Sequence, residues 1–443
     1  MTLDASARLE VDPLIDDPAT RIIVCCGAGG VGKTTTAAAL GVRAAERGRK
    51  VVVLTIDPAR RLAQSMGIDS LDNTPRRVKG IEGDGELHAM MLDMKRTFDE
   101  IVEAHADAER ARAILENPFY QSLSAGFAGT QEYMAMEKLG QLRARDEWDL
   151  IVVDTPPSRS ALDFLDAPKR LGSFLDGRFI KLLMAPAKVG GRAGMKFLNV
   201  GMSMMTGTLG KLLGGQLLRD VQTFVAAMDT LFGGFRTRAD ATYRLLQAPG
   251  TAFVVVAAPE RDALREAAYF VERLAAEDMP LAGLVLNRVH GSGAAGLSAE
   301  RALAAAENLD ERGIVDQGPG KTGGRDVAAV SPESPAVDHS PEVREVSPET
   351  LGSSHEENEE NEARAAHAAH EAQTPRQLTA GLLRLHAERM QVLAREQRTR
   401  DRFTALHPEV PVTEVPALPG DVHDLGGLRA IGTRLAAETP TRA

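Results

Sequence analysis

The sequence predicts an α/β fold: a doubly wound, mostly parallel sheet with helices on both faces. Two observations support this prediction. Short apolar runs such as "KVVVLTID" (50–57) recur along the chain, and such runs are typical of strands buried on both sides. Segments of helical periodicity such as "ERDALREAAYFVERLAAED" (260–278) separate them, so consecutive strands are expected to be joined by right-handed crossovers.

The expected elements follow in chain order. The run "RIIVCC" (21–26) ends at a glycine and precedes an alanine-rich helical segment, 34–48, which Gly48 terminates. An amphipathic helix is expected late in the chain, over 378–403. Further strands are expected at 50–57, 148–157, 251–260, 281–290 and 410–415, with 86–93 as an additional candidate.

Two stretches interrupt this alternation. Residues 165–246 are rich in leucine, methionine and glycine, carry no strand pattern, and predict an inserted helical subdomain. Residues 291–375 hold seventeen acidic and six basic side chains with no phenylalanine, tyrosine or tryptophan, and predict a disordered acidic insertion. The other expected parts are a flexible N-terminus (1–20), a sheet domain formed by 21–164, 247–290 and 376–434, and a tail (435–443).

Charge and cysteine content exclude several classes of protein. The formal net charge of the 443 residues is −10, which argues against general nucleic-acid binding. The only cysteines, Cys25 and Cys26, are adjacent, so no disulfide framework is expected and a reducing compartment is favoured. Residues 1–20 lack the pattern of a secretory signal, and the uncharged apolar run 197–210 is too short to span a bilayer. We therefore expect a cytoplasmic protein, with peripheral membrane association as an alternative.

The segment "GAGGVGKTTT" carries the most specific functional signal. It fits the pattern G-x-x-x-x-G-K-[ST] and lies between an expected strand and an expected helix. Glycines allow backbone amides to surround a phosphate, and the helix N-terminus adds a positive field. We expect Lys33 to reach the β- and γ-phosphates and Thr34 to hold Mg²⁺. The expected nucleotide-binding residues of the loop are Gly27, Gly29, Gly30, Val31, Gly32, Lys33, Thr34 and Thr35.

Two aspartates end neighbouring strands of the predicted sheet. Asp154 follows the apolar run "LIVV", and Asp57 ends the run that begins at Lys50. The carboxyl end of a strand beside a phosphate-binding loop is where an acid on the Mg²⁺ side is expected. Asp154 is predicted to serve the metal, and Asp57 to lie near it and to orient and deprotonate the attacking water. The alternative for both is a capping or turn residue.

Three segments taken together resemble one family. "GAGGVGKTTTAAALG", "VVVLTIDPARRLAQSMG" and "WDLIVVDTPPSRSALDFL" are similar to the ArsA-type ATPases, P-loop NTPases that include the arsenite-pump ATPase and the targeting ATPase for tail-anchored membrane proteins. The resemblance covers most of 21–290, resumes over 376–434, and implies an enzyme that hydrolyses ATP with Mg²⁺. It places Asp57 in the first switch and Asp154 at the start of the second. It also implies that Asn287 reads adenine and that Pro416 lies in a loop covering the base.

One position departs from the family pattern. In the wider group, which includes MinD and ParA, the loop has the form K-G-G-x-G-K-[ST], and its first lysine reaches across a dimer interface to the partner's phosphates; this chain has Ala28 there. Three explanations stay open. The chain pairs with a related subunit that carries the lysine, or Arg60 or Arg61 supplies the charge, or hydrolysis is slow. The resemblance implies a dimer of identical subunits or of related ATPase subunits.

The methionine-rich stretch bears on cargo. Residues 184–228 contain six methionines, whose flexible thioethers can line a groove for apolar helices. A packed helical core or a dimer contact is the alternative, and in the tail-anchored branch of the family the equivalent region binds a transmembrane segment. A hydrophobic cargo or membrane protein is therefore one candidate partner. The C-x-x-C pair that holds a structural zinc in that branch is absent, so no structural zinc is expected, and metalloid binding is not favoured.

The sequence thus predicts a Mg²⁺-dependent ATPase whose switch loops couple nucleotide state to a partner subunit or a hydrophobic cargo. One alternative is a weakly hydrolysing regulatory subunit of a heteromeric complex, which the missing lysine favours and Asp57 opposes. A second alternative is a partition or positioning ATPase, although the sequence contains no basic DNA-binding stretch or amphipathic C-terminal membrane segment.

Overall fold

The computed structural model describes residues 8–56, 61–123, 131–156, 224, 234, 237–315 and 375–437. The chain divides into two compact units. The first, which we call the sheet unit, comprises Met1–Gly291 and Glu396–Ala443. The second, the helical-pair unit, comprises Ser292–Arg395.

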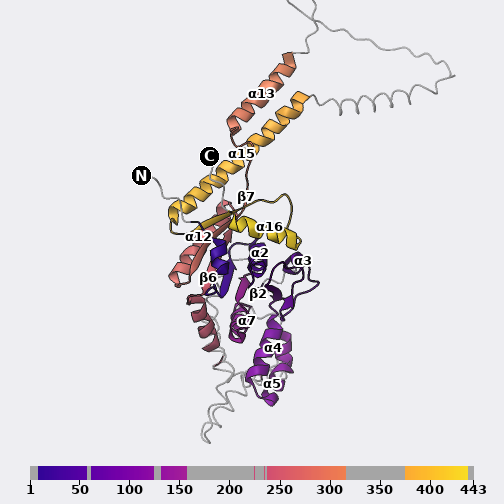
Figure 1. Cartoon of the computed structure of the whole chain (residues 1–443), viewed down its shortest axis with the longest axis vertical. Helices are drawn as coiled ribbons and strands as arrows, with labels where there is room; N and C mark the ends of the chain where they lie inside the picture. The colour runs from indigo at the N-terminus through magenta and orange to yellow at the C-terminus, as the bar shows by residue number, and fades with distance from the viewer. Residues whose placement is uncertain are drawn as a thin grey trace, which may run out of the picture. The chain divides into compact units, whose positions relative to one another are not determined.

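The sheet unit is built on one sheet of eight strands in the order β3-β4-β2-β5-β1-β6-β7-β8. Figure 1 labels β2, β6 and β7 of this sheet among the surrounding helices. Every neighbouring pair is parallel except β3 and β4, which are antiparallel. The predicted doubly wound, mostly parallel α/β fold is therefore confirmed; the two-residue strand β3 was not predicted. The strands are β1 (Ile22–Cys26), β2 (Lys50–Thr55), β3 (Arg76–Arg77), β4 (Glu86–Met91), β5 (Leu150–Asp154), β6 (Thr251–Ala257), β7 (Leu281–Val289) and β8 (Val412–Pro416).

Helices cover both faces of the sheet, and each face has its own apolar core. Successive strand residues point to opposite faces, so Ile22, Val24 and Cys26 enter one core while Ile23 and Cys25 enter the other. Helices α4, α7 and α12 pack in the first core, and α1, α2 and α16 in the second. In the sheet unit, the helices are α1 (Val11–Asp16), α2 (Lys33–Glu46), α3 (Arg61–Ser65), α4 (Met94–His105), α5 (Ala108–Leu115), α6 (Pro118–Leu123), α7 (Gln131–Arg145), α12 (Arg261–Ala276) and α16 (Leu425–Ala436).

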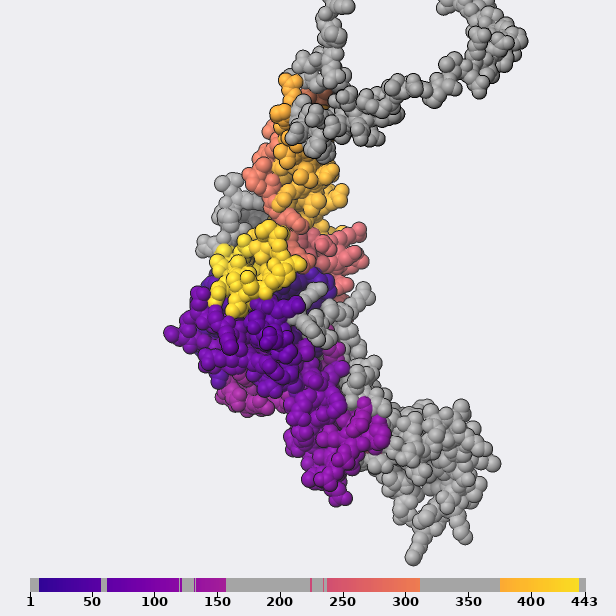
Figure 2. Space-filling model, turned by 90° about the vertical axis from the view of Figure 1, so that its right-hand side faces the viewer, coloured from indigo at the N-terminus to yellow at the C-terminus, as the bar shows by residue number. Residues whose placement is uncertain are grey.

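The C-terminal helix completes the second core. Helix α16 packs on α2, although the two are far apart in the sequence, and Figure 2 shows this yellow segment lying against the indigo N-terminal part of the sheet unit. Gly432 of α16 lies against α2 there, close to Ala39 and Arg43. The helix runs two residues past the predicted end of the domain at 434, and 438–443 lie outside the described residues.

The prediction of a flexible N-terminus was wrong for residues 8–20. This segment contains α1, whose residues Val11 and Ile15 are buried in the second core. The Arg43 guanidinium on α2 holds the Asp12 carboxylate at 2.5 Å, so the acidic residues that suggested a solvated terminus are ion-pair partners of a neighbouring helix. Residues 1–7 lie outside the described part of the chain.

The predicted insertion 291–375 also needs a correction at its beginning. Helix α13 (Ala299–Val315) occupies part of that range, and α15 (Pro375–Leu406) follows it in the described structure. The two helices contact each other in the helical-pair unit, where Arg384 pairs with Asp310 and His386 Nε2 lies 2.8 Å from the Leu297 carbonyl oxygen. Alanine and glutamate favour helix here in spite of the low aromatic content. Residues 316–374 lie outside the described part.

The predicted helical subdomain 165–246 is described only near its end. Residues 237–247 are helical, and Leu246 is fully buried in the first core. Phe224 stacks on Tyr120 with ring centroids 5.9 Å apart. The methionines from Met184 to Met228 lie outside the described residues.

We predict that Arg49 is a main support of the N-terminal segment. Its side chain is 9% exposed and donates hydrogen bonds to the carbonyls of Ile15 (2.8 Å), Thr20 (2.7 Å) and Asp149 (2.5 Å). Arg49→Met should lower the free energy of unfolding by about 2–4 kcal/mol, because buried carbonyls lose a charged donor. Urea denaturation followed by circular dichroism measures this change.

The control is Arg47→Met, which removes an ion pair with Asp16 at the surface. That substitution should lower the free energy of unfolding by less than about 1 kcal/mol. Equal losses in the two variants would contradict the role assigned to Arg49.

Candidate nucleotide-binding site

The loop between β1 and α2 has a backbone that only glycine tolerates at several positions. Gly27 has φ 145°, and a Cβ there would lie 2.1 Å from the carbonyl oxygen of Val256 on β6. Gly32 has φ 97°, and a Cβ would lie 2.2 Å from Nδ2 of Asn287 on β7. The loop therefore rests directly on the carboxyl ends of two strands, as a phosphate-binding loop requires.

The loop leads into the first turn of α2, which is suited to an anion. Gly32 is the N-cap residue, and the first turn contains no acidic side chain, so the helix dipole stays uncompensated at this end. Lys33 begins the helix, is 5% exposed, and donates a hydrogen bond from Nζ to the Ala28 carbonyl at 2.8 Å. The positive end of a helix and a buried ammonium group thus meet at the loop.

Asp154 joins the loop to two strand ends. It is fully buried at the end of β5, and its Oδ2 accepts hydrogen bonds from Thr34 Oγ1 (2.8 Å) and Thr55 Oγ1 (2.9 Å). Thr34 lies in α2 and Thr55 ends β2, so three elements converge on one carboxylate oxygen. Hydroxyl and carboxylate oxygens are the donors that Mg²⁺ prefers, and these residues therefore fit such an ion.

The third residue expected near the metal, Asp57, lies outside the described residues. The chain just before it is fixed beside Asp154, because the Ile56 amide donates to the Asp154 carbonyl at 3.0 Å. The Ile56 carbonyl accepts a hydrogen bond from Gln131 Nε2 at 2.9 Å. Sequence reasoning did not select Thr55, although its position two residues before Asp57 at a strand end was a usable signal.

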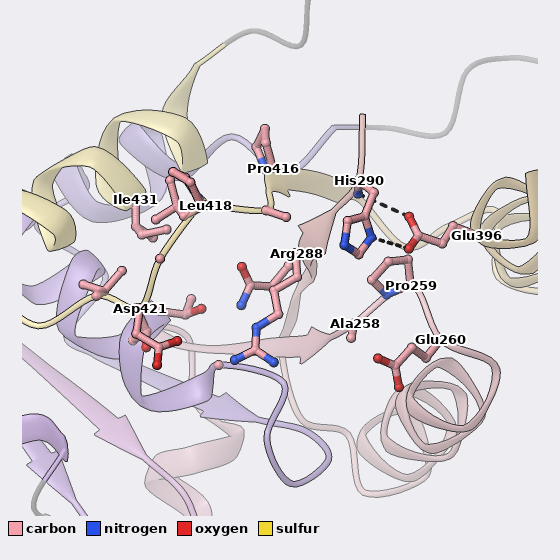
Figure 3. A pocket seen from close by; sticks show the side chains of 18 residues that line it. Ala258, Pro259, Glu260, Arg288, His290, Glu396, Pro416, Leu418, Asp421 and Ile431 are labelled. Atoms are coloured by element: carbon pink, nitrogen blue, oxygen red, sulfur yellow. Dashed lines mark hydrogen bonds and ion pairs between the residues drawn. The ribbon is translucent and has the colours of Figure 1, made fainter. Parts of the chain in front are cut away.

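A cavity of about 600 Å³ opens beside the loop (Figure 3). Its walls come from the start of α2, the carboxyl ends of β6, β7 and β8, and the segment between β8 and α16. Thr35 and Gly32 lie on the loop side, while Pro416, Leu418 and Ile431 give an apolar wall. A cavity with one apolar wall and one phosphate-binding wall suits a nucleotide.

Two residues expected to contact the base line this cavity. Asn287 is 8% exposed at the end of β7 and donates from Nδ2 to the Val31 carbonyl at 2.8 Å, so it also ties β7 to the loop. Pro416 ends β8, and the next amide, that of Ala417, donates to the Val289 carbonyl at 2.9 Å. Thus the structure brings Asn287, Pro416 and the loop to one cavity.

Sequence reasoning missed Arg288. This residue lines the large cavity and also a second one of about 260 Å³, which the loop residues Ala28 to Val31 line from the other side. The available signal was a charged residue directly after the asparagine of an otherwise apolar strand.

A histidine–glutamate pair forms another part of the cavity wall that was not predicted. Nδ1 of His290 lies 2.5 Å from Oε1 of Glu396, and the His290 amide donates to Oε2 at 3.2 Å (Figure 3). The pair holds the end of β7 against the C-terminal part of α15, which belongs to the sheet unit.

Ala28 is buried where the related loops carry their first lysine. The residue is 8% exposed, packs in the second core, and borders the smaller cavity together with Glu260, Asp262 and Glu266. Of the two arginines considered as substitutes, Arg60 lies outside the described residues, and Arg61 begins α3 with its side chain undescribed.

The two cysteines are not arranged as a shared ligand site. Cys25 and Cys26 point to opposite faces of the sheet. Burial raises the pKa of the Cys26 thiol to about 12 and raises the pKa of the Cys25 thiol well above its usual value, so both are neutral at physiological pH. Within the described ranges, no group of three or more His, Cys, Asp or Glu residues is placed to hold a metal ion.

Among the helices that the structure describes, none combines the length and the apolar character needed to cross a bilayer.

Comparison with known proteins identifies relatives. The chain is 29% identical over 170 residues to the ATPase GET3 of Malassezia globosa, which covers 38% of this chain and 49% of that protein. It is 26% identical over 288 residues to the ATPase GET3 of Podospora anserina, covering 65% of this chain and 78% of the relative. It is 27% identical over 288 residues to the ATPase ARSA2 of Chlamydomonas reinhardtii, covering 62% and 70%. The match therefore spans about half the length of the first relative and more of the other two.

A family profile gives the assignment. The profile of the anion-transporting ATPases matches residues 20–296, more than half of the 443 residues. The matched range contains the loop, Asp154 and Asn287, which the structure brings to one edge of the sheet. The chain therefore belongs to the anion-transporting ATPase family and is a P-loop ATPase of the ArsA type.

Proposed function

We propose that this chain binds ATP with Mg²⁺ at the carboxyl edge of the sheet, hydrolyses it, and uses the change of nucleotide to alter its contacts with a partner subunit or a hydrophobic cargo. The observation that carries the proposal is the convergence of Lys33, Thr34 and Asp154 at a glycine loop that opens onto a cavity of about 600 Å³.

The phosphates are assigned to the loop. Backbone amides between Gly27 and Thr34, together with the N-terminus of α2, provide donors for anionic oxygens. The Lys33 ammonium, which donates to the Ala28 carbonyl in this structure, is close enough to the loop to exchange that neutral acceptor for a phosphate oxygen. A charged acceptor forms the stronger hydrogen bond, so the exchange favours the nucleotide complex.

Thr34 and Asp154 would hold the Mg²⁺ ion. Their oxygens lie within 2.8 Å of each other, and the buried carboxylate gains a counter-charge when a cation is present. Bound Mg²⁺ would neutralise charge on the phosphate oxygens. Thr55 keeps the carboxylate oriented through its own hydroxyl, at 2.9 Å from Oδ2.

The water-activating role belongs to Asp57 by resemblance to the family. The support is that Thr55 and Ile56, just before it, are held against Asp154 by hydrogen bonds. A carboxylate at the end of β2 next to β5 would face the outer phosphate, where a water molecule attacks in line.

The adenine base is assigned to the cavity beyond the loop. Pro416, Leu418 and Ile431 offer an apolar surface for a flat ring, and Asn287 brings an amide to the same wall. Asn287 also donates one amide hydrogen to the Val31 carbonyl. A movement of Asn287 on binding the base would therefore be transmitted to the phosphate-binding loop.

A second candidate function is a regulatory subunit that binds nucleotide and hydrolyses it slowly. Ala28 favours it, because a methyl group provides no charge to a partner's phosphates. We propose that the active form is a dimer with a related subunit that carries the missing lysine.

The proposals of a hydrophobic cargo and of a cytoplasmic location are based mainly on the sequence. The methionines of 184–228 are the candidate contact for an apolar helix, and they lie outside the described residues. Two buried, neutral thiols suit a reducing cytoplasm.

We predict that Lys33→Ala and Asp154→Asn reduce ATP turnover by at least about 100-fold, because each removes a charge that faces the phosphates or the metal. Phosphate release at saturating ATP and Mg²⁺ measures the rate. Lys79→Ala is the control, since Lys79 is an exposed lysine that does not line the large cavity. Unchanged turnover in both site variants would contradict the proposed function.

We predict that Ala28→Lys raises turnover of the isolated chain about tenfold or more, because it restores a cation to the dimer interface. Ala28→Met is the matched control, with similar length and no charge. Addition of a lysine-bearing relative to the wild-type chain should give a comparable increase. If the wild-type chain alone already reaches the rate of Ala28→Lys, the heterodimer and the regulatory function are both wrong.

A further inference from the structure

We propose that Arg288 binds the phosphate chain of the nucleotide held by its own chain and supplies a cation beside the loop in addition to Lys33. This inference rests on the proposed nucleotide site and adds to it a residue that the family pattern of the sequence did not indicate. Four observations support it: the bulge in β7, the two cavities that Arg288 lines, the charges of the cavity walls, and a guanidinium that has no partner among the described residues.

The backbone of β7 is irregular at Arg288. Asn287 pairs with Val415 on β8 and Val289 pairs with Pro416, so the register shifts across Arg288. Arg288 itself has φ 62°, the left-handed region that residues other than glycine rarely adopt. Bulges of this kind occur next to active sites, where they redirect a side chain. The neighbouring Asn287 stays buried against the loop while Arg288 turns outward.

The redirected side chain reaches the phosphate-binding loop. Arg288 lines the large cavity together with Gly32 and Thr35, and it lines the smaller cavity together with Ala28 to Val31. Figure 3 shows the guanidinium projecting into the cavity between Asp421 and Glu260. A group that borders both cavities stands where a phosphate chain must pass from the base pocket to the loop.

The charge of the cavity walls favours such a cation. Among the described residues that line the large cavity, Arg288 is the only lysine or arginine, whereas Glu260, Glu396 and Asp421 carry carboxylates. Glu396 is engaged by His290, which leaves two acids facing the cavity. Arg288 thus offsets the two carboxylates that would otherwise repel an anionic ligand on this side of the cavity.

The guanidinium is available for a ligand. No hydrogen bond or ion pair joins the Arg288 side chain to another residue in the described part of the chain. Its planar group can donate two parallel hydrogen bonds to one phosphate, which lysine cannot do. A strained backbone that presents an arginine with no partner among the described residues, beside a phosphate-binding loop, points to a ligand contact.

The experiment compares Arg288→Asn and Arg288→Lys with the wild-type protein. Asparagine tolerates the left-handed backbone, so Arg288→Asn removes the charge with little effect on folding. We expect the ADP and ATP dissociation constants to rise about 10- to 100-fold in Arg288→Asn, with a smaller rise in Arg288→Lys. Titration calorimetry measures both ligands. Arg402→Asn, at an exposed arginine that lines neither cavity, should bind like the wild type.

Adenosine separates a phosphate contact from a contact to the base or ribose. Ligand-observed NMR detects its weak binding, which should be the same for the wild type and Arg288→Asn. The ADP affinity of the wild type should also decrease more steeply with salt than that of Arg288→Asn.

The outcomes distinguish this inference from the proposed function. A wild-type chain without affinity for ADP or ATP would overturn the proposed function. A wild-type chain that binds them, with Arg288→Asn binding equally well, would overturn only the role of Arg288. An equal loss of affinity for adenosine and ADP would also overturn it, because the contact would then not be to phosphate.

Discussion

The hydrogen bonds to the buried carboxylate of Asp154 are the interaction on which the site depends. A charge with no exposure to solvent is tolerated only when donors surround it, and Thr34 and Thr55 provide them from two different elements. The start of α2, the end of β2 and the end of β5 are therefore held at one point. Any ligand that draws the Thr34 hydroxyl away from Asp154 leaves Thr55, at the end of β2, as the remaining described hydroxyl donor to that carboxylate oxygen.

A second link joins the opposite side of the loop to the base pocket. Asn287 bonds the Val31 carbonyl, and Gly32 is close enough to it that no side chain fits between them. The loop is thus held from β5 on one side and from β7 on the other, which are the two sides to which we assign the metal and the base of the nucleotide. These two links fix the shape of the short glycine-rich segment from both sides.

The sequence was sufficient for the sheet, the loop and Asp154, because buried parallel strands and phosphate-binding glycines leave local patterns. It was insufficient where a contact joins distant segments. Helix α1 was mistaken for a flexible terminus, since the partner of Asp12 is Arg43 on α2. Helix α13 was not predicted, because the acidic composition of the whole range 291–375 suggested disorder. The bulge at Arg288 depends on the pairing of β7 with β8, which no single segment reveals.

The pairing of His290 with Glu396 has a consequence for how the protein is assembled. The chain leaves the sheet unit at Gly291 and re-enters it at Glu396, and the His290 amide is 3.2 Å from a Glu396 carboxylate oxygen. The helical-pair unit is therefore an insertion between β7 and β8. The residues that flank it, His290 and Glu396, are hydrogen-bonded to each other. A change in the length of this segment would therefore leave the pairing of β7 with β8 intact, because that pairing is formed by residues on either side of it.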